Sequence, residues 1–451
     1  MQQTPLQYSL PFDPPFEDRL PARQSNKARQ NDNSIRFEDR VFHDWYRFVL
    51  SYPPHLVRKY LNDFGLDQRS IVLDPFCGTG TTLVEAKRNG VKAIGLEANP
   101  FPCFASRVKT DWNISADELR LFAKQVSEEV YVELSRQGID DKFLTCDSDV
   151  PLRTLNEHAF RTLIKNSISP LPLHKTLVLL DKISVFQNTP AYNHGILALG
   201  NALVQSIGNL RFGPEVGVGK IKRDVPVVAV WMQEIRKMAR DLKSANDKKY
   251  PEINVYLSDA RNLGQAVRKH SIDAVITSPP YPNEKDYTRA TRLESVVLGF
   301  FQDMRHLRGF KKTFLRSNTR GVYKSDSDDK WVADVDEIQR LASAIEARRI
   351  ELGKTSGFEK MYARVTRLYF GGMARHLSTL TRILRPGAKL AYVVGDQASY
   401  LRVMIKTGRI LALIAERQGY QVERIDLFRT RFATATQNNL REEVVVLRWP
   451  G

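Results

Sequence analysis

The chain has 451 residues, 42% of them hydrophobic and 10% aromatic, and these fractions exclude a chain that is disordered along its whole length. The 68 Lys and Arg residues outnumber the 51 Asp and Glu residues, which gives a formal charge of +17 and favours a polyanionic partner such as nucleic acid. The three cysteines lack zinc-site spacing, no signal peptide is recognisable, and no apolar run reaches about 18 residues, so we expect a reducing cytoplasmic setting, no metal and no membrane span.

The N-terminal part of the sequence predicts an arm followed by the start of an α/β sheet. Residues 1–34 are rich in Pro, Gln, Asn and Arg and show no period, which is typical of an arm. A helix is predicted over about 53–64. The segment 70–97 then contains a short apolar strand, a glycine-rich turn, a helix that stops at Gly90 and a second apolar strand that ends in Glu97. This order predicts the opening βαβ unit of a doubly wound parallel sheet.

Two largely helical insertions interrupt the predicted sheet. The first covers 111–249 and begins with an amphipathic helix over 115–137, for which Ser115 and Glu118 predict a capping box. The second covers 301–375 and is basic.

Further strands are predicted from short runs rich in β-branched residues, at 253–259, 272–278, 385–396, 420–428 and 442–450. The sequence therefore predicts an α/β fold with a doubly wound, Rossmann-like sheet of about seven strands, of which the last pair is antiparallel. We assign this core to residues 35–110, 250–300 and 376–451.

The sequence DPFCGTGTT over 74–82, the glycine turn, is a candidate cofactor loop. Glycine suits a turn that needs positive φ and lets a ligand approach the backbone. Glu97 ends the next strand, 19 residues after Gly78, where a carboxylate can accept both ribose hydroxyls of an adenosine cofactor. Leu83 replaces the third glycine of a dinucleotide fingerprint, and Asp74 disfavours an anionic ligand. These features favour S-adenosylmethionine, which is cationic; a glycine turn that serves only packing is the alternative.

The sequence Ser278-Pro279-Pro280-Tyr281, the S-P-P-Y turn, directly follows a predicted strand. Two prolines hold the backbone extended. Ser278 and the Pro279 carbonyl can accept the hydrogens of an exocyclic base amine, and Tyr281 can stack on the base. Asn283, Lys285 and Arg289 follow closely and are further candidates. A proline turn that merely ends a strand is the alternative.

Together, DPFCGTGTT and TSPPY resemble the two signature motifs of the amino DNA methyltransferases, which methylate cytosine N4 or adenine N6 with S-adenosylmethionine. The resemblance covers about 42–100, 250–300 and 380–449. It implies a Rossmann-like methyltransferase sheet, double-stranded DNA as the partner, base flipping, and a role in a restriction–modification or defence system with cognate proteins. The S-P-P-Y form is more typical of cytosine-N4 enzymes.

The resemblance also implies roles for individual residues. The segment 42–54 would contact the methionine end of the cofactor, Glu97 its ribose and Asp259 its adenine amino group. The methionine-side loop would contain Asp74, Phe76, Gly78, Thr79 and Gly80. The catalytic pocket would contain Ser278, Pro279, Pro280 and Tyr281.

Contact with DNA is predicted for the segment 302–324, which has seven basic residues against one acidic residue, a balance of +6, with interleaved aromatic residues. Base flipping costs a few kcal/mol that such contacts must supply. A solvated basic surface is the alternative, and the first insertion could hold target-recognition elements instead. The candidate DNA-binding residues are Arg308, Lys311, Lys312, Arg316, Arg320 and Lys324.

Other functions are compatible with parts of this pattern. Cytosine-C5 chemistry, which needs a nucleophilic cysteine in a Pro-Cys motif, is not expected: Cys77 and Cys146 do not follow a proline, and Cys103 follows Pro102 but lies far from the S-P-P-Y turn in the sequence. An adenine-N6 DNA methyltransferase, an RNA guanine-N2 methyltransferase and a DNA-binding protein without turnover remain open. We expect a protein of the cytoplasm that associates with the nucleoid through DNA.

Overall fold

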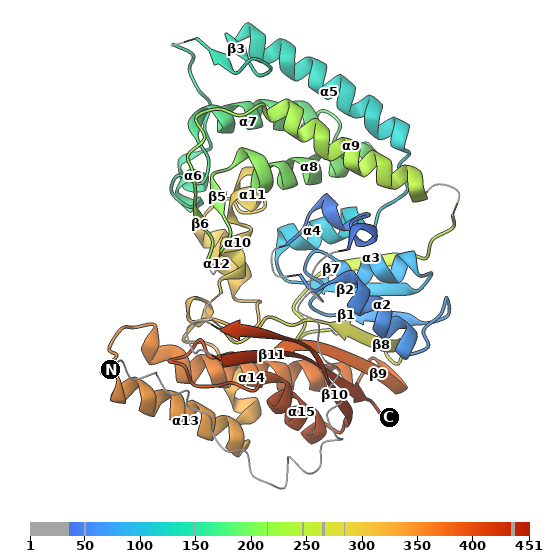
Figure 1. Cartoon of the computed structure of the whole chain (residues 1–451), viewed down its shortest axis with the longest axis vertical. Coiled ribbons are helices and arrows are strands. Elements are labelled where there is room, and N and C mark those ends of the chain that lie inside the picture. The colour runs from blue at the N-terminus through green and yellow to red at the C-terminus, as the bar shows by residue number, and fades with distance from the viewer. Residues whose placement is uncertain are drawn as a thin grey trace.

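The computed structural model describes residues 36–48, 51–147, 149–213, 215–245, 248–263, 267–283, 285–433 and 438–451, so the predicted arm over 1–34 lies outside the described residues. Figure 1 shows two parts, a sheet flanked by helices and a helical lobe above it. Within the described ranges, no helix is both long enough and apolar enough to cross a membrane.

The sheet contains seven strands in the order β10-β11-β9-β8-β1-β2-β7. Strand β11 is antiparallel to both β9 and β10, and the other neighbouring pairs are parallel. The predicted doubly wound α/β sheet with an antiparallel last pair is therefore confirmed. The strand bounds are β1 Ile71–Asp74, β2 Lys92–Glu97, β7 Ile253–Leu257, β8 Ile272–Thr277, β9 Leu384–Gly395, β10 Gln421–Ala433 and β11 Asn438–Arg448.

Helices cover both faces of the sheet because neighbouring residues of each buried strand point to opposite sides. Val72 of β1 packs with helices α2 and α3, whereas Leu73 packs with α13, α14 and α15. These helices are α2 Pro54–Asp63, α3 Thr81–Arg88, α13 Asp336–Glu351, α14 Tyr362–Leu380 and α15 Thr407–Arg417. Helix α14 connects β8 to β9 across the sheet, and the predicted boundary between 375 and 376 falls inside it. The second half of the predicted insertion 301–375 thus packs as part of the core.

The helical lobe has its own apolar core, which α4 shares with the sheet. Cys103 of α4 packs with α3, and Phe101 of the same helix packs with Trp231 and Phe122 of the lobe. Ser115 and Glu118 form the predicted capping box at the start of α5. The helices are α4 Pro100–Lys109, α5 Ala116–Arg136, α6 Glu157–Thr162, α7 Pro170–Ser184, α8 Pro190–Ala202, η3 Leu203–Ile207 and α9 Val227–Ala245.

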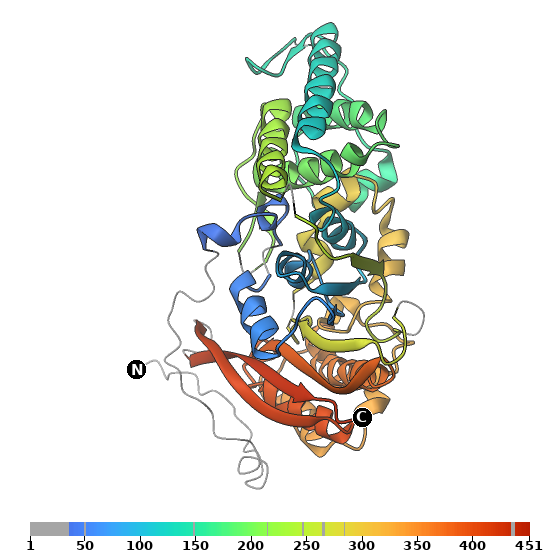
Figure 2. The ribbon, with the colours of Figure 1, turned by 90° about the vertical axis from the view of Figure 1, so that its right-hand side faces the viewer.

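The chain that follows β8 also enters the lobe before it returns to the sheet. Helices α10 Tyr287–Ala290, α11 Arg292–Val297 and α12 Met304–Lys311 lie between the lobe and the sheet, as Figures 1 and 2 show. Leu293 and Val297 of α11 join the apolar core of the lobe. The remaining short elements are the ribbons β3 Ile139–Asp140 with β4 Thr145–Cys146 and β5 Leu210–Arg211 with β6 Gly217–Val218, and the turns η1 Phe37–Asp39, η2 His43–Trp45, η4 Thr319–Gly321, η5 Asp328–Val332 and η6 Glu359–Met361.

Candidate active site

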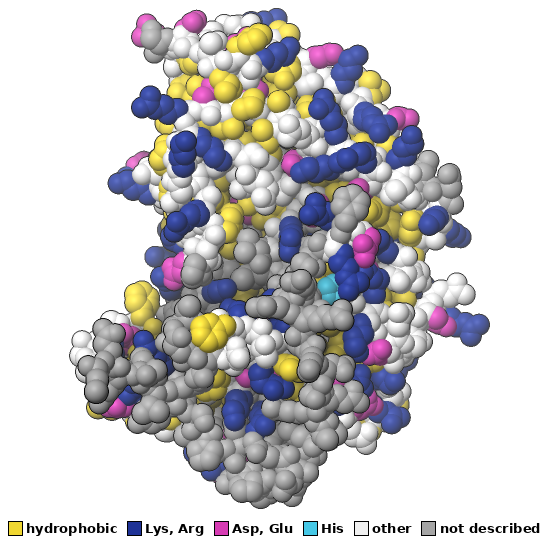
Figure 3. Space-filling view, in the orientation of Figure 1, with side chains coloured by type: hydrophobic (Ala, Val, Ile, Leu, Met, Phe, Trp, Pro, Cys, Tyr) yellow, Lys and Arg dark blue, Asp and Glu magenta, His cyan; other side chains and the backbone are white. Residues whose placement is uncertain are grey.

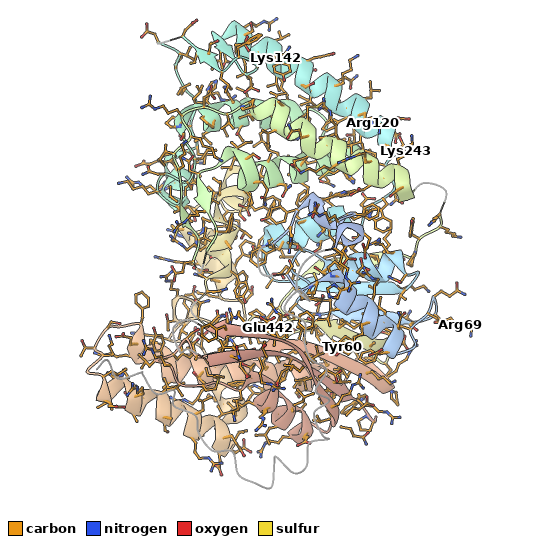
Figure 4. All side chains as sticks on the ribbon, in the orientation of Figure 1. Tyr60, Arg69, Arg120, Lys142, Lys243 and Glu442 are labelled. Atoms are coloured by element: carbon orange, nitrogen blue, oxygen red, sulfur yellow. The ribbon has the colours of Figure 1, made fainter. Side chains whose placement is uncertain are left out.

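A cavity of about 620 Å³ lies where the carboxyl ends of the parallel strands meet. This is the edge of a doubly wound sheet at which ligands bind. The cavity wall includes the glycine turn after β1 and the S-P-P-Y turn after β8, which are about 200 residues apart in the sequence. Further wall residues come from the ends of β2 and β7, from 313–318, and from β10 and β11, where Figure 4 labels Glu442.

The glycine turn has a backbone that only glycine adopts readily at two positions. Gly78 has a φ of 52° and Gly80 a φ of 82°, both in the left-handed region. A Cβ at Gly80 would in addition lie 3.0 Å from Oγ of Ser106. Phe76, Gly78 and Thr79 line the cavity, whereas Gly80 begins α3 behind them. The turn therefore presents backbone to the cavity.

Glu97 lies at the end of β2 and lines the cavity. Its two oxygens accept hydrogen bonds from the backbone N–H groups of Gly78, at 2.9 Å, and Asn99, at 2.7 Å. Burial raises the pKa of Glu97 to about 7, against the effect of these hydrogen bonds. Each oxygen keeps a lone pair for a further donor, so the carboxylate can accept ligand hydroxyls.

Asp259 follows β7 and also lines the cavity, where Arg261 holds its carboxylate. Arg261 donates from Nε to Oδ1 at 3.0 Å and from Nη2 to Oδ2 at 2.8 Å. The same guanidinium pairs with Asp328 and donates to the Thr313 carbonyl at 3.1 Å. Arg261 thus ties the acid after β7 to the wall segment 313–318. The role of Arg261 could not be predicted from the sequence, because only the fold brings Asp328 to its guanidinium.

Asp74, the first residue of the glycine turn, does not line the cavity. It is fully buried, and its oxygens accept hydrogen bonds from Thr277 Oγ1 at 2.6 Å, from the Phe76 N–H at 3.1 Å and from the Tyr52 hydroxyl at 3.1 Å. Burial raises the pKa of Asp74 to about 6. Asp74 therefore lies beneath the cavity wall, and its implied contact with the cofactor stays a prediction.

The S-P-P-Y turn presents acceptors and an aromatic ring to the cavity. The Ser278 hydroxyl donates to the Val393 carbonyl of β9 at 3.0 Å, so its oxygen lone pairs remain available as acceptors. The Tyr281 ring packs against Gly395, where an added Cβ would lie 3.0 Å from Cε2. Burial raises the pKa of Tyr281, so its phenol stays neutral near pH 7. This arrangement can bind a planar group that carries hydrogen-bond donors.

Comparison with known proteins points to a chemistry for this cavity. Residues 9–105 match the model of a DNA methylase family. The chain is 26% identical over 465 residues to type II methyltransferase M.BsoBI of Geobacillus stearothermophilus, an alignment that covers 96% of this chain and 87% of the relative. The chain resembles the amino DNA methyltransferases. Type II methyltransferase M.AvaI of Anabaena variabilis is 23% identical over 90% of this chain and 86% of its own length. The resemblance predicted from the motifs is confirmed.

Segments that precede or follow the two motifs complete the cavity. Tyr52 and Phe48, from the predicted contact segment 42–54, both line it, and Phe48 stacks on Tyr287 with 6.1 Å between ring centroids. Of the candidates after Tyr281, Lys285 lines the cavity half-buried, and burial lowers its pKa. Asn283 lines it too, whereas Arg289 donates to the Val216 carbonyl at 3.0 Å.

The six predicted DNA-binding residues separate into two groups. Arg316 is only 4% exposed, and it pairs with Asp326 and donates to backbone carbonyls of its own segment. Lys311 pairs with Asp286 at 2.8 Å. Both residues also line the cavity, and their contact with DNA stays a prediction. The other four are exposed: Arg308, Lys312, Arg320 and Lys324. Figure 3 shows basic side chains over both parts of the molecule.

Proposed function

We propose that the chain transfers the methyl group of S-adenosylmethionine to the exocyclic amine of a base flipped out of double-stranded DNA, with cytosine N4 as the target. One observation carries the proposal: the glycine turn and the S-P-P-Y turn line the same cavity. The methyl donor and the amine it methylates must meet within one site, because the reacting atoms have to approach to about 3–3.5 Å.

The cavity residues fit the cofactor. Glu97 would accept hydrogen bonds from the ribose hydroxyls, and Asp259, held by Arg261, would accept one from the adenine amino group. Backbone of the glycine turn, with Phe76, would surround the methionine end. When bound, the cofactor supplies an electrophilic methyl group on a sulfonium. The left-handed Gly78 supports this assignment, because a side chain there would be strained beside the ligand.

The S-P-P-Y turn would activate the amine by accepting its hydrogens. The amine lone pair is conjugated into the base ring, which makes the nitrogen a poor nucleophile. Ser278, whose own hydrogen is directed to Val393, and the Pro279 carbonyl would accept the two amine hydrogens and favour a pyramidal nitrogen. The nitrogen–carbon bond forms as the sulfur–carbon bond breaks, and one amine proton then leaves to water. Tyr281 would hold the ring of the base by stacking.

Exposed basic residues would supply the contacts to DNA. Arg308, Lys312, Arg320 and Lys324 lie between the S-P-P-Y turn and α13, close in the chain to the cavity wall 313–318. Contacts to phosphates would help to offset the cost of base flipping. We assign target recognition to the lobe formed by 111–249. The relatives are named type II methyltransferases, which supports a role in restriction–modification in the cytoplasm, with a cognate nuclease as partner.

The choice of cytosine N4 over adenine N6 rests on Ser278. Adenine N6 remains the second candidate, because the DNA methylase match and the relatives do not distinguish the two bases. RNA methylation and DNA binding without turnover follow as alternatives.

Incubation of the protein with S-adenosylmethionine labelled in the methyl group, and with either duplex DNA or total RNA, tests the proposal. Nucleosides from the digested nucleic acid are then analysed by mass spectrometry. The proposal predicts labelled N4-methylcytosine from DNA alone. Labelled N6-methyladenine would show that adenine, not cytosine, is the target base. Label found only in RNA would overturn DNA as the substrate. Absence of label from both would favour a binding protein.

A further inference from the structure

The glycine turn and the S-P-P-Y turn are not joined by backbone pairing. Strand β1 pairs with β8 at Val72 with Ala274 and at Leu73 with Val275, and the ladder ends there. The two turns begin at Asp74 and Ser278, beyond the last paired residues. Side chains that link the two turns can therefore help to set their separation.

Buried hydroxyl groups make this connection. Thr277, the last residue of β8, donates from Oγ1 to Asp74 Oδ1 at 2.6 Å. The Tyr52 hydroxyl donates to Asp74 Oδ2 at 3.1 Å and also contacts the Thr82 hydroxyl. Thr82, at the start of α3, in turn donates to the Ile276 carbonyl of β8 at 3.0 Å. The network thus crosses between the two strands twice.

None of the buried members of this network needs to touch a ligand to act. Asp74, Thr82 and Thr277 are all fully buried and do not line the cavity, whereas the Tyr52 side chain does. Asp74 also accepts the Phe76 N–H at 3.1 Å, which fixes the first residues of the glycine turn to the same carboxylate. Thr277 directly precedes Ser278, so its hydrogen bond to Asp74 ties the start of the S-P-P-Y turn to the glycine turn.

We infer that Thr277 and Asp74 are positioning residues that hold the S-P-P-Y turn at a fixed distance from the glycine turn. The inference rests on the proposed methyl transfer, because it assigns the network to the approach of amine and methyl group. A misplacement of about 1 Å can reduce a rate about 100-fold without changing how tightly either reactant binds. The network should therefore matter for the chemical step more than for binding.

Thr277→Val tests this inference, because valine has nearly the shape of threonine and lacks only the hydroxyl. The rate of methyl transfer is measured in single turnover, with enzyme already bound to S-adenosylmethionine and mixed with its target duplex, and cofactor affinity is measured separately by calorimetry. We expect a rate reduced about 10- to 100-fold, with cofactor and DNA affinities within about threefold of wild type. Thr277→Ser, which keeps the hydroxyl, should restore most of the rate.

Thr366→Val is the matched control. Thr366 is a fully buried threonine of α14 whose hydroxyl donates to the Tyr362 carbonyl at 2.9 Å, away from the cavity lining. Its rate of methyl transfer should stay within about twofold of wild type. If Thr277→Val does not fold, Thr82→Val removes the other hydroxyl bond to β8, at the Ile276 carbonyl, and should show the same loss of rate with retained cofactor affinity.

The outcomes separate this inference from the proposed function. A wild-type protein that binds S-adenosylmethionine but methylates no DNA contradicts the proposed function itself. A wild-type protein that methylates DNA, with Thr277→Val or Thr82→Val at the wild-type rate, overturns the positioning role alone. An equal loss of rate in Thr366→Val, or a loss of cofactor affinity as large as the loss of rate, would also overturn it.

Discussion

Glu97→Gln removes the charge that the proposal assigns to binding of the cofactor ribose. In the wild type, one oxygen of Glu97 accepts from the Gly78 N–H and the other from the Asn99 N–H. A glutamine side chain has a single oxygen, so its NH2 group must face one of these two N–H donors. The substitution therefore disturbs the turn as well as weakening the bond to a hydroxyl.

The size of the effect follows from these contacts. A hydrogen bond to a charged group contributes about 1.5–3 kcal/mol, and each 1.4 kcal/mol is a factor of about 10 in affinity. We expect Glu97→Gln to weaken S-adenosylmethionine binding about 10- to 100-fold, as measured by isothermal titration calorimetry. Glu442→Gln is the matched control, since it changes the charge equally at the β11 side of the same cavity, and it should leave cofactor affinity within about twofold.

The pH dependence of binding gives a second readout of the same carboxylate. Burial raises the pKa of Glu97 to about 7, so the free protein holds a proton there below neutral pH. A ligand whose hydroxyls donate to the carboxylate must displace that proton. Cofactor affinity should therefore rise from pH 6 to pH 8, by at most about tenfold per pH unit, and then stay constant at higher pH. Affinity of Glu97→Gln within threefold of wild type, or a wild-type affinity that is flat over this range, would refute the reasoning.

Tyr281→Ala should abolish most turnover while S-adenosylmethionine still binds, and an equal loss of cofactor affinity in calorimetry would contradict the assignment of Tyr281 to the base. Arg316→Ala should lower the free energy of unfolding by about 1.5–3 kcal/mol in urea titrations, because it removes charged hydrogen bonds to Asp326, which also accepts the Tyr323 N–H; an unchanged stability would contradict a structural role for Arg316. Arg320→Ala combined with Lys324→Ala should reduce the slope of log affinity for DNA against log salt by about 0.9 for each phosphate that the variant no longer neutralises. Arg69→Ala, just before β1 at the edge of the sheet opposite the cavity and labelled in Figure 4, should leave that slope unchanged. Equal slopes for all these proteins would show that Arg320 and Lys324 do not contact DNA.

The central part of the fold could be predicted because its signals are local. Apolar runs that end in the glycine turn, in Glu97 and in the S-P-P-Y turn mark strand ends, and parallel strands bring their carboxyl ends to one edge. The left-handed φ of Gly78 and Gly80 follows from the same turn. The cavity between the two turns could therefore be predicted from sequence patterns alone.

The sequence could not reveal the partners of predicted site residues when those partners lie elsewhere in the chain. A count of cations in 302–324 cannot reveal that Arg316 faces Asp326 or that Lys311 faces Asp286, since only the fold creates those pairs. Likewise, the motif predicts a cavity position for Asp74, but Tyr52 and Thr277 enclose it.

Helix α14 shows a different limit. The basic composition of 301–375 favours an insertion for the whole segment. In α14, however, Leu368, Met373 and Leu377 are fully buried in the core beneath the sheet. Their spacing is helical and apolar, and weighing that period against the charge count would have placed the helix against the sheet.

A structure of the protein bound to its target duplex and to a non-reactive analogue of S-adenosylmethionine would test the central claim most directly. The decisive quantity is the distance from the amine of the flipped base to the analogue atom that takes the place of the transferable methyl carbon. The account predicts that this amine lies against Ser278 and Pro279, with the methyl position about 3–3.5 Å away. A base that remains stacked in the duplex, or an analogue bound away from Glu97 and the glycine turn, would contradict it.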